Sequence, residues 1–179
     1  MNNVAVLVVD VQNGLMNKAV FQREAFLASL KNLLAAARAK GVPVIYVRHC
    51  DEKGGELEEG SDNWHIYREI APAAGEEVVD KWFNSAFRRT DLKERLDALG
   101  IDTVILAGMM TEYCVDATCR AAFELDYTVV TTPELNTTLA TDNGGIPTET
   151  MHRFFNQTVW NKRYALVIPA AELLVRLDW

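Results

Sequence analysis

The chain has 179 residues, of which 49% are hydrophobic and 24% are charged, and it carries a formal net charge of −7 at pH 7. This composition excludes a disordered or fibrous chain, and the negative charge opposes a broad phosphate-binding surface. No apolar run is long enough to cross a bilayer, and the first residues lack the basic start of a signal peptide. We therefore expect no nucleic-acid partner, no membrane partner and a cytoplasmic location.

Apolar runs typical of strands alternate along the chain with amphipathic stretches typical of helices. Residues 4–9, VAVLVV, are continuously apolar, which indicates a strand covered on both faces in a parallel sheet. From residue 23 to residue 40 the apolar positions recur at helical spacing, and Gly41 ends the helix. Residues 42–49 predict a second strand. The polar stretch 50–75 predicts a long loop, and connections of this length are often functional.

The same alternation continues to residue 174. We expect strands at 76–82, 102–109 and 127–134, helices at 90–100, 112–125 and 146–159, and a last strand entering a terminal helix at 165–174. Thr90 is expected to cap its helix. The core-facing positions expected in the helix at 112–125 are Val115, Thr118, Cys119, Ala122 and Phe123. The predicted fold class is α/β: one domain, residues 1–179, with a doubly wound, Rossmann-like, mostly parallel β-sheet and helices on both faces.

Sites in doubly wound sheets form beyond the carboxyl ends of the strands, where the strand order reverses. This rule points to Asp10, His49 and Lys81, each at the end of a predicted strand, and to the segment leading to Cys114. Considered singly, Asp10 is more often a turn or cap residue, and Lys81 a solvated charge. Neither residue alone indicates catalysis.

Cys114 lies in the first helical turn predicted after the strand at 102–109. The free N–H groups and macrodipole of a helix start favour a thiolate, and they could hold the oxyanion of a tetrahedral intermediate. Alternatively the thiol packs as a small hydrophobe, and its position alone leaves both interpretations open. Cys119 points about 140° away around the same helix and is expected in the core. Cys50, beside the long loop, is expected to be an incidental, partly exposed thiol.

The histidines allow a metal site as an alternative. His49, Asp51 and His65 together offer imidazole and carboxylate ligands. However, a His-x-Asp pair such as His49 and Asp51 is frequent in loops without a metal. His152 lies within a predicted helix and is expected to be a surface or packing residue. The three cysteines show no C-x-x-C spacing, so neither a zinc site nor a disulfide framework is indicated.

Three segments in chain order together resemble one family. They are VLVVDVQNGLM at residues 6–16, DKWFNSAF at 80–87 and GMMTEYCV at 108–115. They are similar to motifs of the isochorismatase-like cysteine hydrolases, a family that includes nicotinamidases, N-carbamoylsarcosine amidohydrolases and isochorismatases. The stretches at 47–64 and 137–160 resemble the branch that contains streptothricin hydrolase-like proteins.

The resemblance implies a catalytic triad of Asp10, Lys81 and Cys114. It also implies a cis peptide bond between Met109 and Met110, which directs the N–H groups of Met110 and Cys114 toward an oxyanion hole. Cys114 then attacks a carbonyl carbon after Asp10 takes its proton, while Lys81 holds the carboxylate. Such an enzyme hydrolyses an amide, lactam or carbamoyl C–N bond of a small molecule through a thioacyl intermediate. The resemblance implies no cofactor. It does imply that the protein forms a homo-oligomer.

The sequence departs from the nicotinamidase pattern at one informative place. Nicotinamidases carry an Asp-x-His pair that helps to bind a metal, whereas this chain has the reverse order at His49 and Asp51, so nicotinamide is not the expected substrate. No bound metal is expected, and the set of His49, Asp51 and His65 is kept as the alternative. Two other functions stay open: isochorismatase-type vinyl-ether hydrolysis without a cysteine nucleophile, and a non-catalytic oligomeric binding protein. The candidate substrate-binding residues are Gln12, His49, Trp82, Phe87 and Tyr113.

Overall fold

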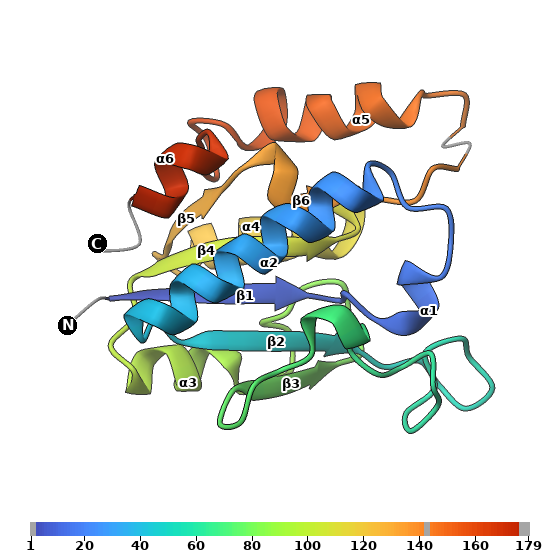
Figure 1. Cartoon of the computed structure of the whole chain (residues 1–179), viewed down its shortest axis with the longest axis horizontal. Coiled ribbons are helices and arrows are strands. Elements are labelled where there is room, and N and C mark those ends of the chain that lie inside the picture. Colours follow the sequence, from blue (N-terminus) through green and yellow to red (C-terminus); the bar gives the residue numbers. More distant parts are fainter. Residues whose placement is uncertain (1–2, 142–143, 176–179) are drawn as a thin grey trace.

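The computed structural model describes residues 3–141 and 144–175, and these fold around one parallel sheet (Figure 1). The strands run in the spatial order β3-β2-β1-β4-β5-β7, and β6 pairs with β4 beyond the end of β5. Their bounds are β1 (Val4–Val9), β2 (Val44–His49), β3 (Glu77–Lys81), β4 (Thr103–Met109), β5 (Thr128–Thr131), β6 (Asn136–Thr137) and β7 (Leu166–Val167). The order reverses between β1 and β4, so the predicted α/β, doubly wound fold class is confirmed.

Helices cover both faces of this sheet, and Figure 1 shows α2 lying across one of them. The helices are α1 (Asn13–Met16), α2 (Arg23–Lys40), α3 (Leu92–Ala98), α4 (Asp116–Glu124), α5 (Thr148–Phe154) and α6 (Ala170–Val175). Apolar side chains of α2 and α6 pack on one face, in a core with Val6 and Val8. Those of α3 and α4 pack on the other face with Leu7 and Val9. The alternation of side chains along β1 therefore feeds two separate cores.

The central strands β1 and β4 lie closest together at the carboxyl edge of the sheet. Val9 is in register with Gly108, and both strands are buried along their whole length. Gly108 has φ +136°, and a Cβ placed there would lie 2.1 Å from the carbonyl oxygen of Val9. The absence of a side chain at position 108 is thus what lets the two strands end side by side.

The helix expected at 112–125 starts differently from the prediction. A π-helical turn, Thr111–Val115, follows β4 directly and leads into α4. Phe123 was expected in the core but is 44% exposed, because it lies at the end of α4 with its ring edge-on to Tyr164. Thr90 does not cap α3: the N-cap is Asp91, and the Thr90 hydroxyl only weakly accepts the N–H of Leu92 at 3.4 Å.

Several short elements were not predicted, and helices α3, α4 and α5 are shorter than expected. Helix α1 and strand β6 have four and two residues, too few to produce a periodic pattern. The predicted helix at 146–159 is α5 followed by a π-helical turn, Phe155–Trp160, whose Trp160 is fully buried.

The loop at 50–75 is irregular, but it is packed against the sheet. It buries five large apolar side chains: Leu57, Trp64, Ile66, Tyr67 and Ile70. The expectation for Cys50 was wrong, because this thiol is only 2% exposed and accepts the indole N–H of Trp64 at 3.1 Å. Folding the loop back over the end of β2 covers the cysteine.

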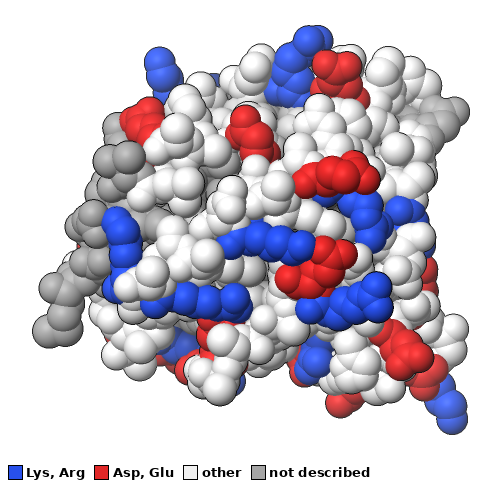
Figure 2. Space-filling model, in the orientation of Figure 1, with Lys and Arg blue, Asp and Glu red and all other residues white. Residues whose placement is uncertain are grey.

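Ion pairs join this loop and the segment after it to the N-terminal part of the chain. Lys18 binds Glu56, Lys31 binds Glu69 and Arg38 binds Glu76. On the face seen in Figure 2, basic and acidic side chains accordingly lie next to one another. Exposed pairs of this kind contribute about 0–1 kcal/mol each. Within the described ranges, no helix has both the length and the apolar character needed to cross a membrane.

The close approach at Gly108 gives a test of the fold. We expect Gly108→Ala to destabilise the protein by more than about 3 kcal/mol, because both the positive φ and the contact with Val9 oppose a Cβ. Gly100→Ala is the matched control: its φ is +66°, but no atom lies within 4 Å of the added Cβ. That change should cost about 1–2 kcal/mol. Urea unfolding of both variants measures the difference, and equal losses would contradict the account.

Candidate active site

Four residues from four strand ends meet at the carboxyl edge of the sheet. Asp10 follows β1, His49 ends β2, Lys81 ends β3, and Cys114 lies in the π-helical turn after β4. A carboxylate oxygen of Asp10, a ring nitrogen of His49 and the Sγ of Cys114 all lie within 4.8 Å of one another. The cluster sits where the strand order reverses, which is where this fold class places its sites.

The ammonium group of Lys81 is the centre of the cluster. Lys81 is 0% exposed, and its Nζ lies 2.6 Å from Asp10 Oδ2, 3.1 Å from His49 Nδ1 and 3.3 Å from Cys114 Sγ. An ammonium has three N–H donors and no acceptor, so these three contacts use all of them. Lys81 therefore holds the other three side chains in one place.

This arrangement fixes the protonation of His49. Since Lys81 donates to Nδ1, that nitrogen must be the acceptor and the proton must reside on Nε2. Nε2 faces Asp51 Oδ1 at 3.4 Å. Burial, and after it the positive charge of Lys81, lowers the pKa of His49. His49 is thus a neutral imidazole in this site.

Asp10 is held in an unusual backbone conformation at the end of β1. It has φ +53°, its N–H bonds to Val47 O at 2.9 Å, and the residue is 1% exposed. One carboxylate oxygen, Oδ2, accepts from Lys81. The other, Oδ1, is buried and finds no hydrogen-bond partner in the described part of the chain. A buried acceptor without a partner is costly, and this one is available to receive a proton.

In the resting site, burial opposes the thiolate that a helix start would favour. The pKa of Cys114 is raised to about 12, first because the thiol is buried and then because Asp10 is negatively charged. Lys81 acts in the opposite direction but does not compensate. Cys114 is therefore a thiol at neutral pH, and its Sγ lies 3.9 Å from Asn84 Oδ1.

The segment that carries Cys114 is anchored by its own backbone and by a buried polar network. The peptide bond between Met109 and Met110 is cis, as the family resemblance implied. The Met110 carbonyl accepts the N–H groups of Tyr113 and Val115, at 3.0 and 3.2 Å. The Thr111 hydroxyl donates to Asn136 Oδ1 at 2.8 Å, and Asn136 is bonded in turn to Asn156. The sequence analysis missed this pair of asparagines, because nothing local marks them.

A cleft of about 160 Å³ opens onto the cluster. Its polar lining comes from Asp10, His49, Asn84 and Cys114. Its apolar lining comes from Leu15, Leu57, Met109, Met110 and Tyr113. The sequence singled out Met110 and Tyr113 but not Leu15, Leu57 or Asn84, which reach the cleft from α1, the long loop and the segment after β3.

The other candidate substrate-binding residues lie in different surroundings. The Gln12 amide is fully buried and bonds to the backbone of His49 and Trp64, so it ties the long loop to β2. Phe87 stacks on Tyr127 and packs against a core cluster. Trp82 is 53% exposed and does not line the cleft. For these three residues, contact with a substrate stays a prediction that the cleft lining does not support.

The alternative metal set is not assembled. His65 is exposed, with its ring against Trp64 rather than beside His49 and Asp51. Among the described residues, the group with metal-binding spacing is instead Asp10, His49 and Cys114. Those are the three side chains that the Lys81 ammonium already contacts.

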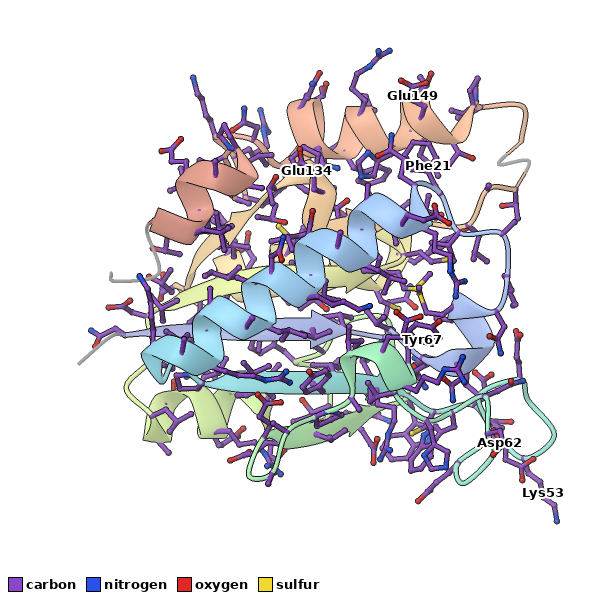
Figure 3. The ribbon with its side chains drawn as sticks, viewed as in Figure 1. Phe21, Lys53, Asp62, Tyr67, Glu134 and Glu149 are labelled. Carbon is purple, nitrogen blue, oxygen red and sulfur yellow. The ribbon has the colours of Figure 1, made fainter. Side chains whose placement is uncertain are left out.

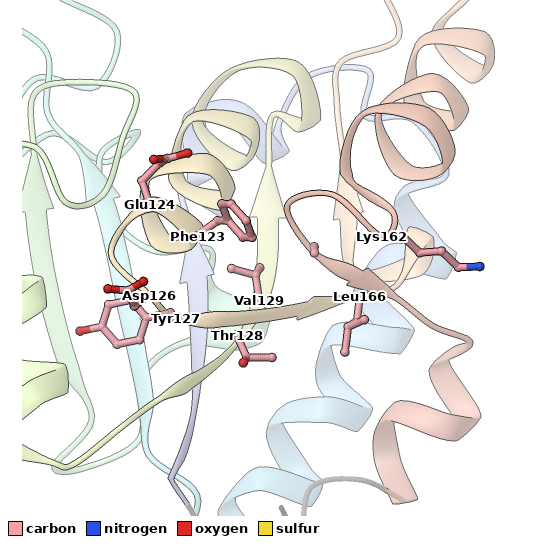
Figure 4. A pocket seen from close by; sticks show the side chains of 9 residues that line it. Phe123, Glu124, Asp126, Tyr127, Thr128, Val129, Lys162 and Leu166 are labelled. Carbon is pink, nitrogen blue, oxygen red and sulfur yellow. The ribbon is translucent and has the colours of Figure 1, made fainter.

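A larger hollow of about 600 Å³ lies at the opposite, amino edge of the sheet (Figure 4). It is wide and lies between the end of α4, the start of β5 and the turn before β7. Its lining residues are Phe123, Glu124, Asp126, Tyr127, Thr128, Val129, Lys162, Ala165 and Leu166. Its described lining residues include no cysteine or histidine.

Comparisons with known proteins agree with this geometry. Residues 4–159 match the family model of the isochorismatase domain. Streptothricin hydrolase from Streptomyces noursei is 34% identical over 128 residues, which cover 70% of this chain but only 46% of that protein. The isochorismatase family protein YddQ of Bacillus subtilis is 31% identical over 172 residues, covering 91% of this chain and 94% of the relative.

Solved structures show the same fold. An isochorismatase hydrolase structure from Oleispira antarctica has 34% identity and a TM-score of 0.89, and the match covers 97% of each chain. A cysteine hydrolase from Pseudomonas syringae pv. phaseolicola has 26% identity and a TM-score of 0.89, covering 98% of this chain and 92% of that one. The chain therefore belongs to the isochorismatase family and is a hydrolase of that family.

Proposed function

We propose that this hydrolase cleaves a C–N bond of a small amide, lactam or carbamoyl compound, with Cys114 as the nucleophile. The observation that carries the proposal is the buried Lys81 ammonium, which contacts Asp10 at 2.6 Å and Cys114 at 3.3 Å. Amidohydrolases occur among the relatives, including a ureidoacrylate amidohydrolase of Agrobacterium fabrum that is 31% identical over 167 residues.

The first chemical step follows from the charges in the cluster. Cys114 rests as a thiol, so a base must take its proton as the sulfur attacks. Asp10 is that base, because its free Oδ1 lies in the cluster and its Oδ2 is held by Lys81. Lys81 stays protonated and donates to the sulfur, which stabilises the thiolate as it forms.

The remaining steps use the same groups in reverse. The carbonyl oxygen becomes an oxyanion, for which the backbone N–H groups of Met110 and Cys114 at the cleft wall are the proposed donors. Asp10 returns its proton to the departing nitrogen, and the acyl group remains on Cys114 as a thioester. Asp10 then takes a proton from water, whose oxygen attacks the thioester carbon. The C–S bond breaks, the carboxylic acid is released, and Asp10 returns the proton to the sulfur to restore the Cys114 thiol. The homo-oligomeric state and the cytoplasmic location stay predictions.

Replacement of the nucleophile is the direct test of this function. In an ammonia-release screen over small amides, with a chelator present, Cys114→Ala should lower kcat/KM by about 10⁴-fold or more. Cys119→Ala is the matched control, because it also replaces a buried cysteine by alanine, but in helix α4 and away from the cluster. It should keep turnover within about tenfold.

The same screen separates the competing functions. If Cys114→Ala kept full turnover while Asp10→Asn abolished it, nucleophilic catalysis by cysteine would be excluded and ether-type hydrolysis favoured. If neither replacement changed turnover of a true substrate, the cluster would not be the active site. No turnover of any amide, lactam or carbamoyl compound by the wild-type protein would count against C–N hydrolysis.

The roles of Asp10 and Lys81 predict an unusual reactivity of the thiol. In the wild type, alkylation of Cys114 by iodoacetamide should be slow at pH 8, because a raised pKa keeps the thiol protonated until the pH approaches 12. Asp10→Asn removes the negative charge but leaves Lys81, so the pKa of Cys114 should fall. Each unit of decrease raises the thiolate fraction tenfold, and we expect labelling at least about tenfold faster.

Asp10→Asn should also lose turnover, because the proposed base is missing. Faster labelling of Cys114 together with lost turnover would show that thiol reactivity and catalysis depend on Asp10 in opposite ways. Peptide mapping distinguishes Cys114 from Cys50 and Cys119. Asp102→Asn serves as the control, since it makes the same change just before β4, at the end of that strand remote from Cys114. Labelling of Cys114 that stayed unchanged or slowed in Asp10→Asn would contradict the proposed coupling.

A further inference from the structure

The cleft at Cys114 has an apolar wall facing the reacting groups. Five of its nine lining residues are Leu15, Leu57, Met109, Met110 and Tyr113. Met109 and Leu57 are 0% and 5% exposed, so this wall is largely fixed by the packing of β4 and the long loop. A substrate that enters the cleft must lay part of its surface against these side chains.

The polar lining offers no positive charge to a substrate. Among the described lining residues, Asp10 is the charged side chain, while Asn84 and the neutral His49 are hydrogen-bonding groups without net charge. The nearest cation, Lys81, has its three donors engaged by Asp10, His49 and Cys114. Asp51 adds a second carboxylate beside His49. Lys53 of the long loop projects outward, away from the strand ends (Figure 3).

A carboxylate in this cleft would therefore lose water without gaining a partner. Burial of an unpaired anion is strongly unfavourable, and the charges of Asp10 and Asp51 add repulsion. An apolar group meets no such penalty and gains contact with the wall.

We infer that the substrate is a small amide, or a compound of similar shape, whose acyl group is uncharged and apolar. This inference rests on the proposed C–N hydrolysis. It narrows that activity, because it excludes amides that carry a second, ionised carboxyl group on the acyl chain. His49 and Asn84 remain to orient the amide itself.

A matched pair of amides tests the inference. In 4-methylpentanamide the chain ends in two methyl groups, and in succinamate two carboxylate oxygens take their places on the same skeleton. We expect kcat/KM for 4-methylpentanamide to exceed that for succinamate by at least about 100-fold. 4-Aminobutanamide, with a terminal ammonium, tests whether the carboxylates attract a cation instead. Equal or faster turnover of either charged amide would overturn the inference.

Binding to Cys114→Ala keeps this test separate from the proposed function. The variant lacks the nucleophile but retains the apolar wall, so calorimetry should show the same preference for 4-methylpentanamide even if the wild type hydrolyses neither amide. That result would contradict the proposed C–N hydrolysis but support the inferred class of uncharged, apolar ligands. Tighter binding of succinamate, or no binding of 4-methylpentanamide, would overturn the ligand class whatever the chemistry.

A charge introduced at the wall should reverse the preference. Leu15→Arg places a guanidinium at the cleft and should raise kcat/KM for succinamate by about tenfold or more relative to Leu15→Gln, its polar uncharged control. Tyr113→Arg tests the same point from the half-exposed Tyr113 side of the cleft. The inference would fail if the glutamine variant gained as much, or if both folded arginine variants gained nothing.

Discussion

The contact on which the site depends is that of the fully buried Lys81 ammonium with Asp10, His49 and Cys114. A buried charge is tolerated only where it is paired and its donors are satisfied, and here each donor meets one acceptor from a different segment. Three parallel strands and the turn after a fourth deliver these groups to one edge of the sheet. The fold thus supplies the pairing that makes a buried lysine stable, and the lysine in turn fixes where the other side chains lie.

Burial also decides how the thiol can act. The neighbourhood that holds Cys114 in place raises its pKa, so the nucleophile is kept protonated until a base removes the proton. The proposed base is the Asp10 Oδ1 oxygen, which has no hydrogen-bond partner among the described residues. Among the described residues that line the cleft there is no cation, and Lys81 behind it is already bonded to Asp10, His49 and Cys114. Reactivity and the inferred preference for an uncharged acyl group therefore share one physical origin.

Much of this could be predicted from the sequence, and the failures have physical reasons. The apolar runs and helical periods gave the parallel α/β order, and strand ends pointed to Asp10, His49 and Lys81. What spacing along the chain cannot show is how segments fold back in space. Cys50 was expected to be exposed because the loop that covers it looks polar, and Asn136 and Asn156 act only through contacts distant in sequence. For Cys114, the position at a helix start left two interpretations open, because burial and the charge of Asp10 also determine the pKa of the thiol.

The central claim is that a protonated Lys81 donates to three acceptors, which requires a neutral His49 with its proton on Nε2. A long-range ¹H–¹⁵N spectrum of the three histidines, with His49→Gln to assign the signal, measures this directly. Because the pKa of His49 is lowered from 6.5, most of the rings should be neutral at pH 6.5, with Nε2 protonated and Nδ1 without a proton. A proton on Nδ1, or a charged imidazolium at that pH, would contradict the account.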